Sequence, residues 1–224
     1  MKVYISPSSQ EHNDVSGYNE EVVQNEIADI LIPELIRHGI EVMRNSRENT
    51  FREHIIESNA YQPDFHVAMH SNASAASSSH TARGCSVYCF DPLDRNNQGT
   101  LLAEYLHNFF MEIPVVRDRG LASGKLTLSE ISKTNAPAVL VEIDFHDNVE
   151  GARWIIDYKK QIANAYLMGI LTAFKISYTP VIATPIFLYR VQVGSFHNYS
   201  YAKNMVDNLT KDGYFPYIKK EVEL

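Results

Sequence analysis

The sequence predicts an α/β protein in which a mostly parallel, twisted β-sheet is flanked by helices in three layers, followed by a small C-terminal βαβ unit. Two observations indicate this fold. Short apolar runs, rich in β-branched and aromatic residues, alternate with amphipathic segments of helical period. Such alternation is typical of a parallel sheet covered by helices. The alternation stops near residue 176, where a segment with two prolines leads into a second, shorter pattern.

The first strand and helix are expected at residues 2–5 and 20–37. The segment KVYI is mostly β-branched or aromatic, as in a buried strand, and the polar loop SPSSQEHNDVSGYN follows it. Apolar side chains in residues 20–37 recur at helical spacing. Pro33 predicts a bend in this helix, and Gly39 ends it as a C-terminal cap.

The same alternation continues through the next three segments. Residues 40–44 are expected to form a strand, and residues 51–61 a helix that Pro63 prevents from continuing. Residues 65–69 (FHVAM) form an apolar run that predicts a third strand, which ends at His70.

The remaining elements of the sheet lie in the second half of this region. Strands are expected at residues 84–90 and 138–143, and a helix with an apolar stripe at residues 99–112. Residues 119–132 indicate a loop with short pieces of structure. A long helix is expected at residues 154–176, because its apolar side chains keep a helical period throughout.

The sequence therefore divides into a catalytic domain at residues 1–176, a linker at residues 177–187 and a terminal unit at residues 188–224. The linker, SYTPVIATPIF, has two prolines and no charged residue. The terminal unit is expected to contain a strand, a helix at residues 199–212 and a second strand at residues 215–223. A piece of about 37 residues is too small to bury a core of its own, so it must dock on the domain or pair with another chain.

Composition narrows the classes of function. The net charge is −7, and the Lys and Arg residues form no cluster, which argues against a nucleic-acid-binding protein. No apolar run is long enough to span a membrane. The first residues, MKVYIS, resemble a strand and not a secretory signal. The sequence thus indicates synthesis in the cytoplasm, and a role outside the cell would require release.

Side chains able to bind a metal or transfer a proton stand at ends of the expected strands. His70 follows one apolar strand, and Glu142 interrupts another, where a carboxylate is costly unless it is paired or functional. His12 lies in the first loop, and Glu20 opens the first helix. Two histidines and one carboxylate leave a fourth position on zinc for water, and a further carboxylate can accept the proton of that water. We therefore expect a zinc hydrolase, with His12, Glu20 and His70 as ligands and Glu142 as general base.

Other residues compete for these roles. Glu21 and Glu26 lie on the same helix as Glu20, and a carboxylate at a helix start is also favoured by the helix dipole alone. His66 and His146 are further candidates, although His66 is interpreted as a packed histidine deeper in its strand. The remaining histidines are interpreted as surface residues: His38, His54, His80, His107 and His197.

Three motifs, in order, resemble the amidase-3 type of zinc-dependent N-acetylmuramoyl-L-alanine amidases over roughly residues 1–176. NEEVVQNEIADILIPELIRHGIEV resembles the first helix of that family, with a metal-binding glutamate at its start. DFHVAMHSNAS resembles the strand that ends in S-x-H-x-N-A, and PAVLVEIDFHDN resembles P-A-x-L-V-E-x-x-F-x-x-N. The resemblance implies zinc and hydrolysis of the amide between N-acetylmuramic acid and L-alanine in peptidoglycan.

The resemblance also assigns residues. It implies that Glu20 and His70 are zinc ligands, that Glu142 is the catalytic glutamate, and that Asn72 and Asn148 shape the substrate site. The family usually carries Gly-His-Gly-Gly or Gly-His-Ser after its first strand. This chain has SPSSQEHN there, and His12, the only histidine of the loop, is assigned as the first ligand.

The C-terminal segment YRVQVGSFHNYSYAKNMVDNLTKDGYFPYIKK resembles the first half of a SPOR domain, a peptidoglycan-binding module. Arg190, Gln192 and Phe196 match its first strand and are the expected cell-wall contacts. Because a whole module needs about two such repeats, we hypothesise that two chains supply one half each in a homodimer.

The leading hypothesis is a cell-wall lytic amidase, either a phage endolysin or a bacterial autolysin. A zinc peptidase or carboxypeptidase acting on wall peptides is a second reading, since the same chemistry serves both. A non-catalytic peptidoglycan-binding protein is a third, and it predicts no bound metal.

Overall fold

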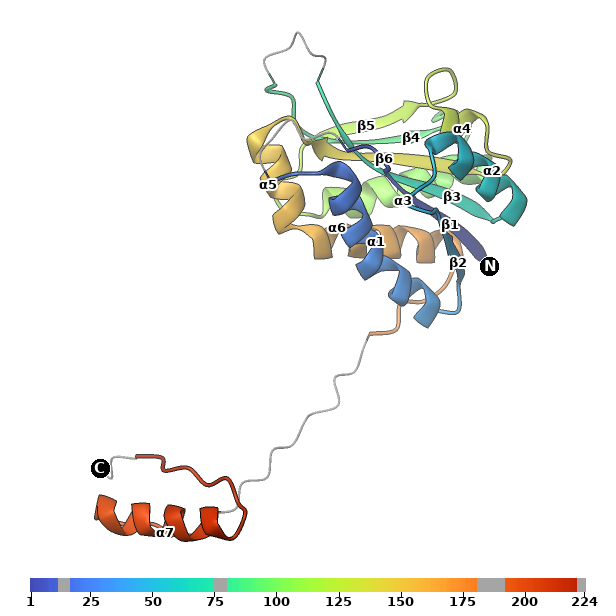
Figure 1. Cartoon of the computed structure of the whole chain (residues 1–224). Coiled ribbons are helices and arrows are strands. Elements are labelled where there is room, and N and C mark those ends of the chain that lie inside the picture. Colours follow the sequence, from blue (N-terminus) through green and yellow to red (C-terminus); the bar gives the residue numbers. More distant parts are fainter. Residues whose placement is uncertain (12–16, 75–79, 181–191, 221–224) are drawn as a thin grey trace. The chain divides into compact units, whose positions relative to one another are not determined.

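A computed structural model describes residues 1–11, 17–74, 80–180 and 192–220 (Figure 1). The chain divides into two compact units, Met1–Pro180 and Val181–Leu224, and each is described by itself.

The larger unit is built on one mixed, mostly parallel sheet with strand order β2-β1-β3-β6-β4-β5. Neighbours among β2, β1, β3 and β6 are parallel. Strand β4 is antiparallel to β6 and parallel to β5. The strands are β1 (Lys2–Pro7), β2 (Glu41–Arg44), β3 (Phe65–Asn72), β4 (Cys85–Cys89), β5 (Asp118–Ser123) and β6 (Ala138–Phe145).

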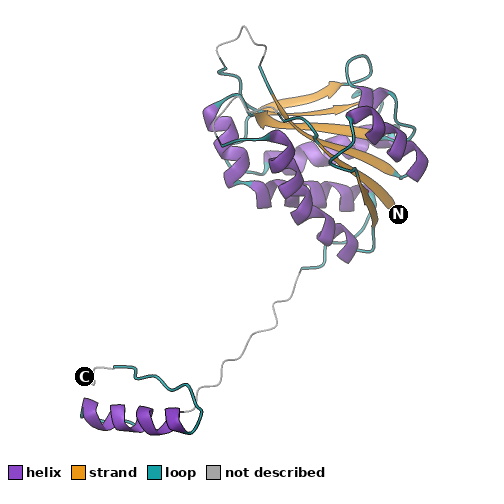
Figure 2. Cartoon of the chain, viewed as in Figure 1, coloured by secondary structure: helices purple, strands orange, loops and turns teal. Residues whose placement is uncertain are grey.

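Helices cover both faces of the sheet and give the three layers that the sequence predicts (Figure 2). On one face α6 packs against α1 and α3, and on the other face α2 contacts α4. The helices of this unit are α1 (Glu20–Arg37), α2 (Phe51–Tyr61), α3 (Gln98–Met111), α4 (Ser129–Ser132), α5 (Val149–Asp157) and α6 (Lys159–Ala173).

The two faces of the sheet differ in chemistry because successive side chains of a strand point to opposite faces. On β3, Val67 and Met69 enter the main apolar core beneath α1, α3 and α6. The alternate residues, His66 and His70, belong to the face covered by α2 and α4, where Ala68 joins a smaller apolar cluster. Polar groups are therefore concentrated on the second face of the sheet.

The final helix of this unit is divided, whereas the sequence predicts one helix over residues 154–176. Helix α5 begins after its cap Asn148 and ends at Asp157, and α6 begins at Lys159, with Tyr158 as the cap between them. The two helices pack on different partners: α5 contacts β6, and α6 contacts α1 and α3. A single straight helix cannot pack against both of these surfaces. The apolar periodicity of the sequence does not reveal the break between the two helices.

The terminal unit contains one helix, α7 (Tyr199–Lys211), capped by the side chain of Asn198. The sequence predicts a strand on each side of it. This prediction is wrong for the described residues 192–196 and 215–220, which form no strand. A strand needs a hydrogen-bonded neighbour, and the described residues of this unit offer none. Residues 188–191 and 221–223 of the predicted strands lie outside the described residues.

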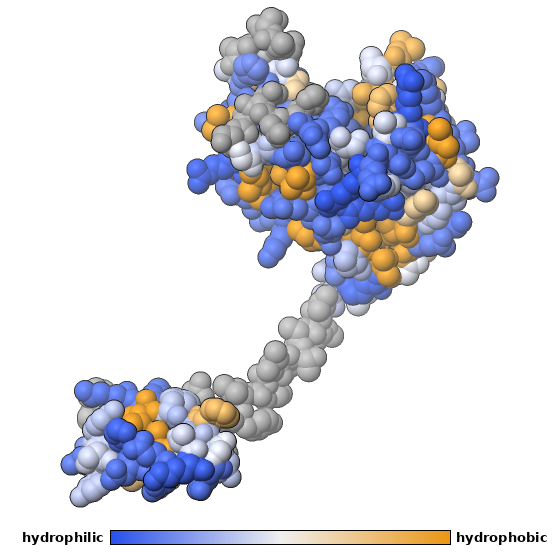
Figure 3. All heavy atoms as spheres, in the orientation of Figure 1, coloured by the Kyte–Doolittle hydropathy of each residue, from blue (hydrophilic) through white to orange (hydrophobic). Residues whose placement is uncertain are grey.

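Helix α7 has no buried residue, and apolar side chains are visible on the surface of the unit (Figure 3). Within the described part of the chain, no helix is both long and apolar enough to cross a membrane. Exposed large side chains of the unit are Val193, Phe196, Tyr199, Tyr201, Tyr214, Phe215, Tyr217 and Ile218.

Candidate active site

The candidate site forms at the end of β3, where His70 and Glu142 occupy paired positions on neighbouring strands β3 and β6. The start of α1 brings Glu20 to the same place, with Glu20 Oε1 3.1 Å from His70 Nδ1. Three of the residues that the sequence singles out thus come together from elements that are far apart in the chain.

Glu20 reaches the site because Asn19 fixes the start of α1. The Asn19 side chain accepts a hydrogen bond from the amide of Val22, as expected of a helix N-cap. The carboxylate of Glu20 is almost fully buried. It accepts a hydrogen bond from the backbone amide of Ser71 at 3.0 Å. Glu26 instead forms an ion pair with Lys159 on the surface. The structure therefore places Glu20, and not Glu26, beside His70.

Carboxylates stand on both sides of the His70 ring. Nδ1 lies 3.1 Å from Glu20, and Nε2 lies 3.3 Å from Glu130 Oε2. Burial lowers the pKa of His70, but the hydrogen bonds with Glu130 and Glu20 outweigh it and raise the pKa well above its usual value. Position Nδ1 thus faces a negative oxygen, a setting that attracts a cation.

Glu142 is a carboxylate with one oxygen available for a further hydrogen bond. Its Oε2 atom is shielded from solvent and has no hydrogen-bond partner among the described residues. Burial raises the pKa of Glu142 to about 7, with a smaller lowering effect from His70 and raising effects from Glu20 and Glu130. A carboxyl group that titrates near neutral pH is suited to accept and return a proton.

Glu130 on α4 is a member of the site that the sequence analysis missed. Its Oε1 atom accepts a 2.6 Å bond from the Ser6 hydroxyl and lies 3.1 Å from His66 Nε2. Burial alone raises the pKa of Glu130, but hydrogen bonds from His66 and His70 outweigh it and hold the pKa well below its usual value. Glu130 lies in a segment with no periodic pattern, so no sequence signal marks it.

Glu20 and His70 have the chemistry and spacing of zinc ligands. Two donors held at about 2.0–2.2 Å from a tetrahedral zinc ion lie roughly 3.3–3.6 Å apart, so the 3.1 Å between these atoms needs to open only slightly. No set of three His, Cys, Asp or Glu side chains able to hold a metal occurs within residues 1–11, 17–74, 80–180 and 192–220. His12, the predicted third ligand, lies outside the described residues.

Three histidines besides His70 are buried: His54, His66 and His146. His66 is packed deep in the sheet, as predicted, and His146 is buried with Nδ1 3.9 Å from Glu20 Oε2. His54, however, is buried, and the prediction that it lies on the surface is wrong. It packs inward from α2, and the amide of Asn45 donates to its ring at 2.9 Å.

The two motif asparagines lie at element boundaries. Asn72 ends β3, and its carbonyl accepts a bond from the amide of His146. Asn148 caps α5 through its side-chain oxygen, and its amide donates to the carbonyl of His80.

Of the predicted wall contacts, Gln192 and Phe196 are exposed in the terminal unit. Arg190 lies outside the described residues.

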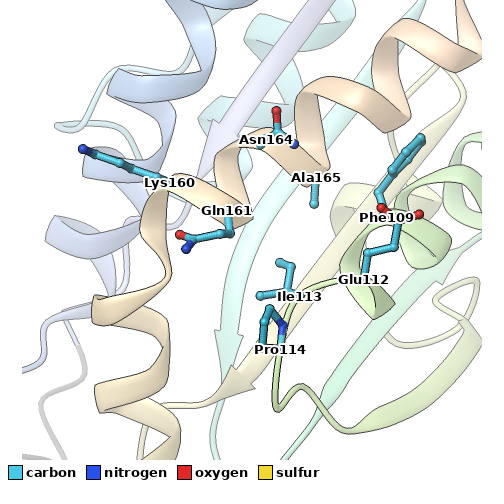
Figure 4. Close-up of a pocket in the computed structure, with 8 residues that line it drawn as sticks. All are labelled: Phe109, Glu112, Ile113, Pro114, Lys160, Gln161, Asn164 and Ala165. Carbon is cyan, nitrogen blue, oxygen red and sulfur yellow. The ribbon is translucent and has the colours of Figure 1, made fainter.

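A pocket elsewhere on the larger unit contains none of these residues. It lies between the end of α3 and the start of α6, with Phe109, Ile113 and Lys160 among its lining (Figure 4). The candidate site at the ends of the central strands β3 and β6 is therefore separate from this pocket.

Comparison with known proteins identifies both parts of the chain. Residues 8–172 match the N-acetylmuramoyl-L-alanine amidase family, and residues 187–223 match the SPOR domain. No curated protein matches the sequence at a significant level.

Solved structures of amidases share the fold. The amidase AmiC2 of Nostoc punctiforme is 21% identical, with a TM-score of 0.68, over 78% of this chain and 97% of that one. An amidase from Clostridium difficile 630 is 22% identical, with a TM-score of 0.68, over 78% and 96% of the two chains. The catalytic domain of the CD27L endolysin, which targets Clostridium difficile, is 22% identical, with a TM-score of 0.61, over 77% and 97%.

The family match covers well over half of the 224 residues and includes Glu20, His70 and Glu142. It confirms the predicted enzyme class and favours it over a wall-peptide peptidase or a non-catalytic binding protein. The chain belongs to the N-acetylmuramoyl-L-alanine amidase family, whose reaction is hydrolysis of the amide bond between N-acetylmuramic acid and L-alanine in the peptidoglycan of the cell wall.

Proposed function

We propose that this amidase depends on zinc, which Glu20, His70 and His12 hold, and that Glu142 is its general base. Enzymes of the family commonly depend on zinc. The observation that carries the proposal is the pairing of His70 with Glu142 on adjacent strands, while Glu20 faces the His70 ring. The metal-binding side chain of His70 and the proton acceptor Glu142 thus lie side by side on a rigid sheet.

A zinc ion, when bound, would polarise the scissile carbonyl and make the attacking water more acidic. Glu142 accepts the proton of that water and delivers it to the amide nitrogen, so that L-alanine leaves as an amine. The raised pKa of Glu142 supports this role, since a carboxyl near 7 both takes and gives a proton at neutral pH. The carboxylate accepts no hydrogen bond at Oε2 from the described residues, which leaves that atom available.

The two asparagines are proposed to shape the substrate site. Asn148 does so by fixing backbone, since its side chain ties the start of α5 to the carbonyl of His80. Asn72 does so from the end of β3, where its carbonyl holds the segment that follows β6.

Metal analysis of the purified protein, with a matched pair of variants, tests the ligand set. Glu20→Gln is expected to lose zinc together with activity. Glu21→Gln changes the next residue of the same helix turn and is expected to retain both. Equal zinc content in the two variants would contradict the assignment of Glu20.

For the whole chain, we propose a catalytic domain at residues 1–176, a linker at 177–187 and a wall-binding unit at 188–224. The SPOR match supports peptidoglycan as the ligand of the terminal unit, with Arg190, Gln192 and Phe196 as contacts. Its exposed aromatic side chains and unburied helix α7 support pairing with a second copy in a homodimer. Light scattering of the full chain tests this, and a strict monomer would contradict it.

We also propose that the enzyme is made in the cytoplasm and acts on the wall after release, as a phage endolysin or an autolysin. In support, the substrate of the family lies in the cell wall, and the catalytic domain of an endolysin shares the fold. Detection of the protein in the cytoplasm before lysis and on the wall afterwards tests the proposal.

A further inference from the structure

A buried carboxylate touches the far side of the His70 ring, and the reaction as described leaves it without a role. Glu130 belongs to the short helix α4, which follows β5. The next residue, Ile131, is buried with Ala68 and Leu140 and anchors α4 on the sheet. Glu130 itself is almost fully buried and lies 3.3 Å from His70 Nε2.

The two ring nitrogens of His70 have different neighbours. Nε2 faces Glu130, whereas Nδ1 faces Glu20. A carboxylate at one nitrogen of a neutral imidazole keeps the hydrogen on that nitrogen, and the lone pair is then on the other. With Glu130 holding the Nε2 hydrogen, the lone pair of Nδ1 points to the side of Glu20, where the proposed metal position lies.

Glu130 is itself held in place by contacts that do not involve the proposed ligands. The Ser6 hydroxyl donates to its Oε1 at 2.6 Å, and His66 Nε2 lies 3.1 Å from the same oxygen. His66 is fixed in turn by the Ser58 hydroxyl, 2.9 Å from its Nδ1. One oxygen of Glu130 is thus tied to the interior of the protein, and Oε2 is the oxygen that meets His70.

We infer that Glu130 is a positioning residue for the metal centre: it fixes the tautomer and the ring orientation of His70, so that Nδ1 is offered to zinc. This inference rests on the proposed zinc dependence. Partners of this kind, which stand behind a metal-binding histidine, typically change metal affinity or activity by about 10–100-fold when they are removed.

A purely structural role for Glu130 predicts something different. Loss of a buried hydrogen-bonding group would lower the stability of the fold without changing the zinc affinity of the folded protein. Zinc affinity therefore separates the two roles, provided that it is measured on variants that remain folded.

The test compares Glu130→Gln with Ser6→Ala in the full chain. Glu130→Gln preserves shape but removes the charge behind His70, whereas Ser6→Ala removes only a bond to the opposite oxygen. Zinc dissociation constants are measured by competition with a chromogenic chelator, and thermal unfolding of both variants without metal confirms folding. We expect about 10–100-fold weaker zinc binding in Glu130→Gln and less than about threefold change in Ser6→Ala.

A second measurement needs no activity and does not depend on a variant's folding. In the zinc-loaded wild type labelled with ¹⁵N at histidine, His70 is expected to keep its hydrogen on Nε2 and to bind metal through Nδ1. A hydrogen on Nδ1, or unchanged zinc affinity in Glu130→Gln, would overturn the inference while leaving the zinc enzyme intact. Failure of the wild type to bind zinc would overturn the inference and the proposed function together.

Discussion

Glu142 on β6 lies directly beside His70 on β3, as partners in a parallel strand pair. The antiparallel strand β4 places Ser86 on the other side of Glu142. The glutamate is therefore held between two strands in the interior of the sheet, with its Oε2 atom shielded from water. Its position relative to His70 is set by backbone hydrogen bonds, so a proton acceptor and a metal-binding ring keep a constant separation.

Replacement of this glutamate tests its role as general base. Glu142→Gln keeps the size of the side chain but cannot accept the proton of the attacking water. We expect kcat to fall by about 10²–10⁴-fold, with zinc content unchanged, as measured by release of stem peptides and by metal analysis. Activity within tenfold of wild type would remove Glu142 from the mechanism.

The pH dependence of activity follows from the raised pKa of Glu142. Burial shifts it upward to about 7, so the base form is lost as the pH falls through that value. A bound zinc cation stabilises the carboxylate and moves the midpoint downward. We therefore expect kcat/KM to rise with pH and level off with a midpoint at or below about 7. A midpoint above 7, in enzyme that retains zinc, would contradict this assignment.

Replacement of His70 is expected to abolish metal binding. In His70→Ala one of the three proposed ligands is lost, and Glu20 and His12 are not expected to retain the ion. Zinc content should fall to background, and activity should not return at high pH. The matched control is His107→Ala, which removes a ring from α3 that contacts Asp118 and not the site. Zinc bound in His70→Ala at wild-type stoichiometry would show that the ligand set is wrong.

The stability of the fold should fall in mild acid because of His54. Burial lowers the pKa of this histidine, while the charge of Glu130 partly opposes the shift. Below pH 6.5 the unfolded chain then binds a proton that the folded chain binds less well, so the free energy of unfolding decreases as the pH falls. In His54→Gln this contribution is absent, and its melting temperature should change less between pH 7 and 5. Parallel pH profiles for the two proteins would contradict the prediction.

A side chain at Gly151 should disturb the start of α5. A Cβ atom added there would overlap the carbonyl oxygen of Phe145, which is backbone and cannot turn away. We expect Gly151→Ala to lower the free energy of unfolding by about 1–3 kcal/mol, measured by denaturant titration. Arg153→Ala, on the exposed side of the same helix, should stay within about 0.5 kcal/mol of wild type. Similar losses in both variants would show that the contact with Phe145 has no role.

The sequence predicts the sheet and the core of the site because those signals are local. His70 and Glu142 are polar residues at defined places in apolar strands, and the strands pair side by side in the fold. Glu20 opens a helix that the spacing of its apolar residues predicts.

The features that the sequence does not predict depend on distant contacts. Glu130 joins the site only because Ile131 anchors α4 on the sheet, and neither residue stands in a periodic pattern. The break at Tyr158 follows from two separate packing surfaces. Strands expected beside α7 do not form in the described residues, since a strand depends on a partner that its own sequence does not contain.

The most direct test is mass spectrometry of peptidoglycan digested by the zinc-loaded wild type and by Glu142→Gln. With the wild type, we expect stem peptides with a free amino group on L-alanine and glycan strands that retain unsubstituted N-acetylmuramic acid. With the variant, these products should be reduced to trace amounts at equal zinc content. Cleavage within the stem peptide or the glycan, or equal release of L-alanine-terminated peptides by both proteins, would contradict the account.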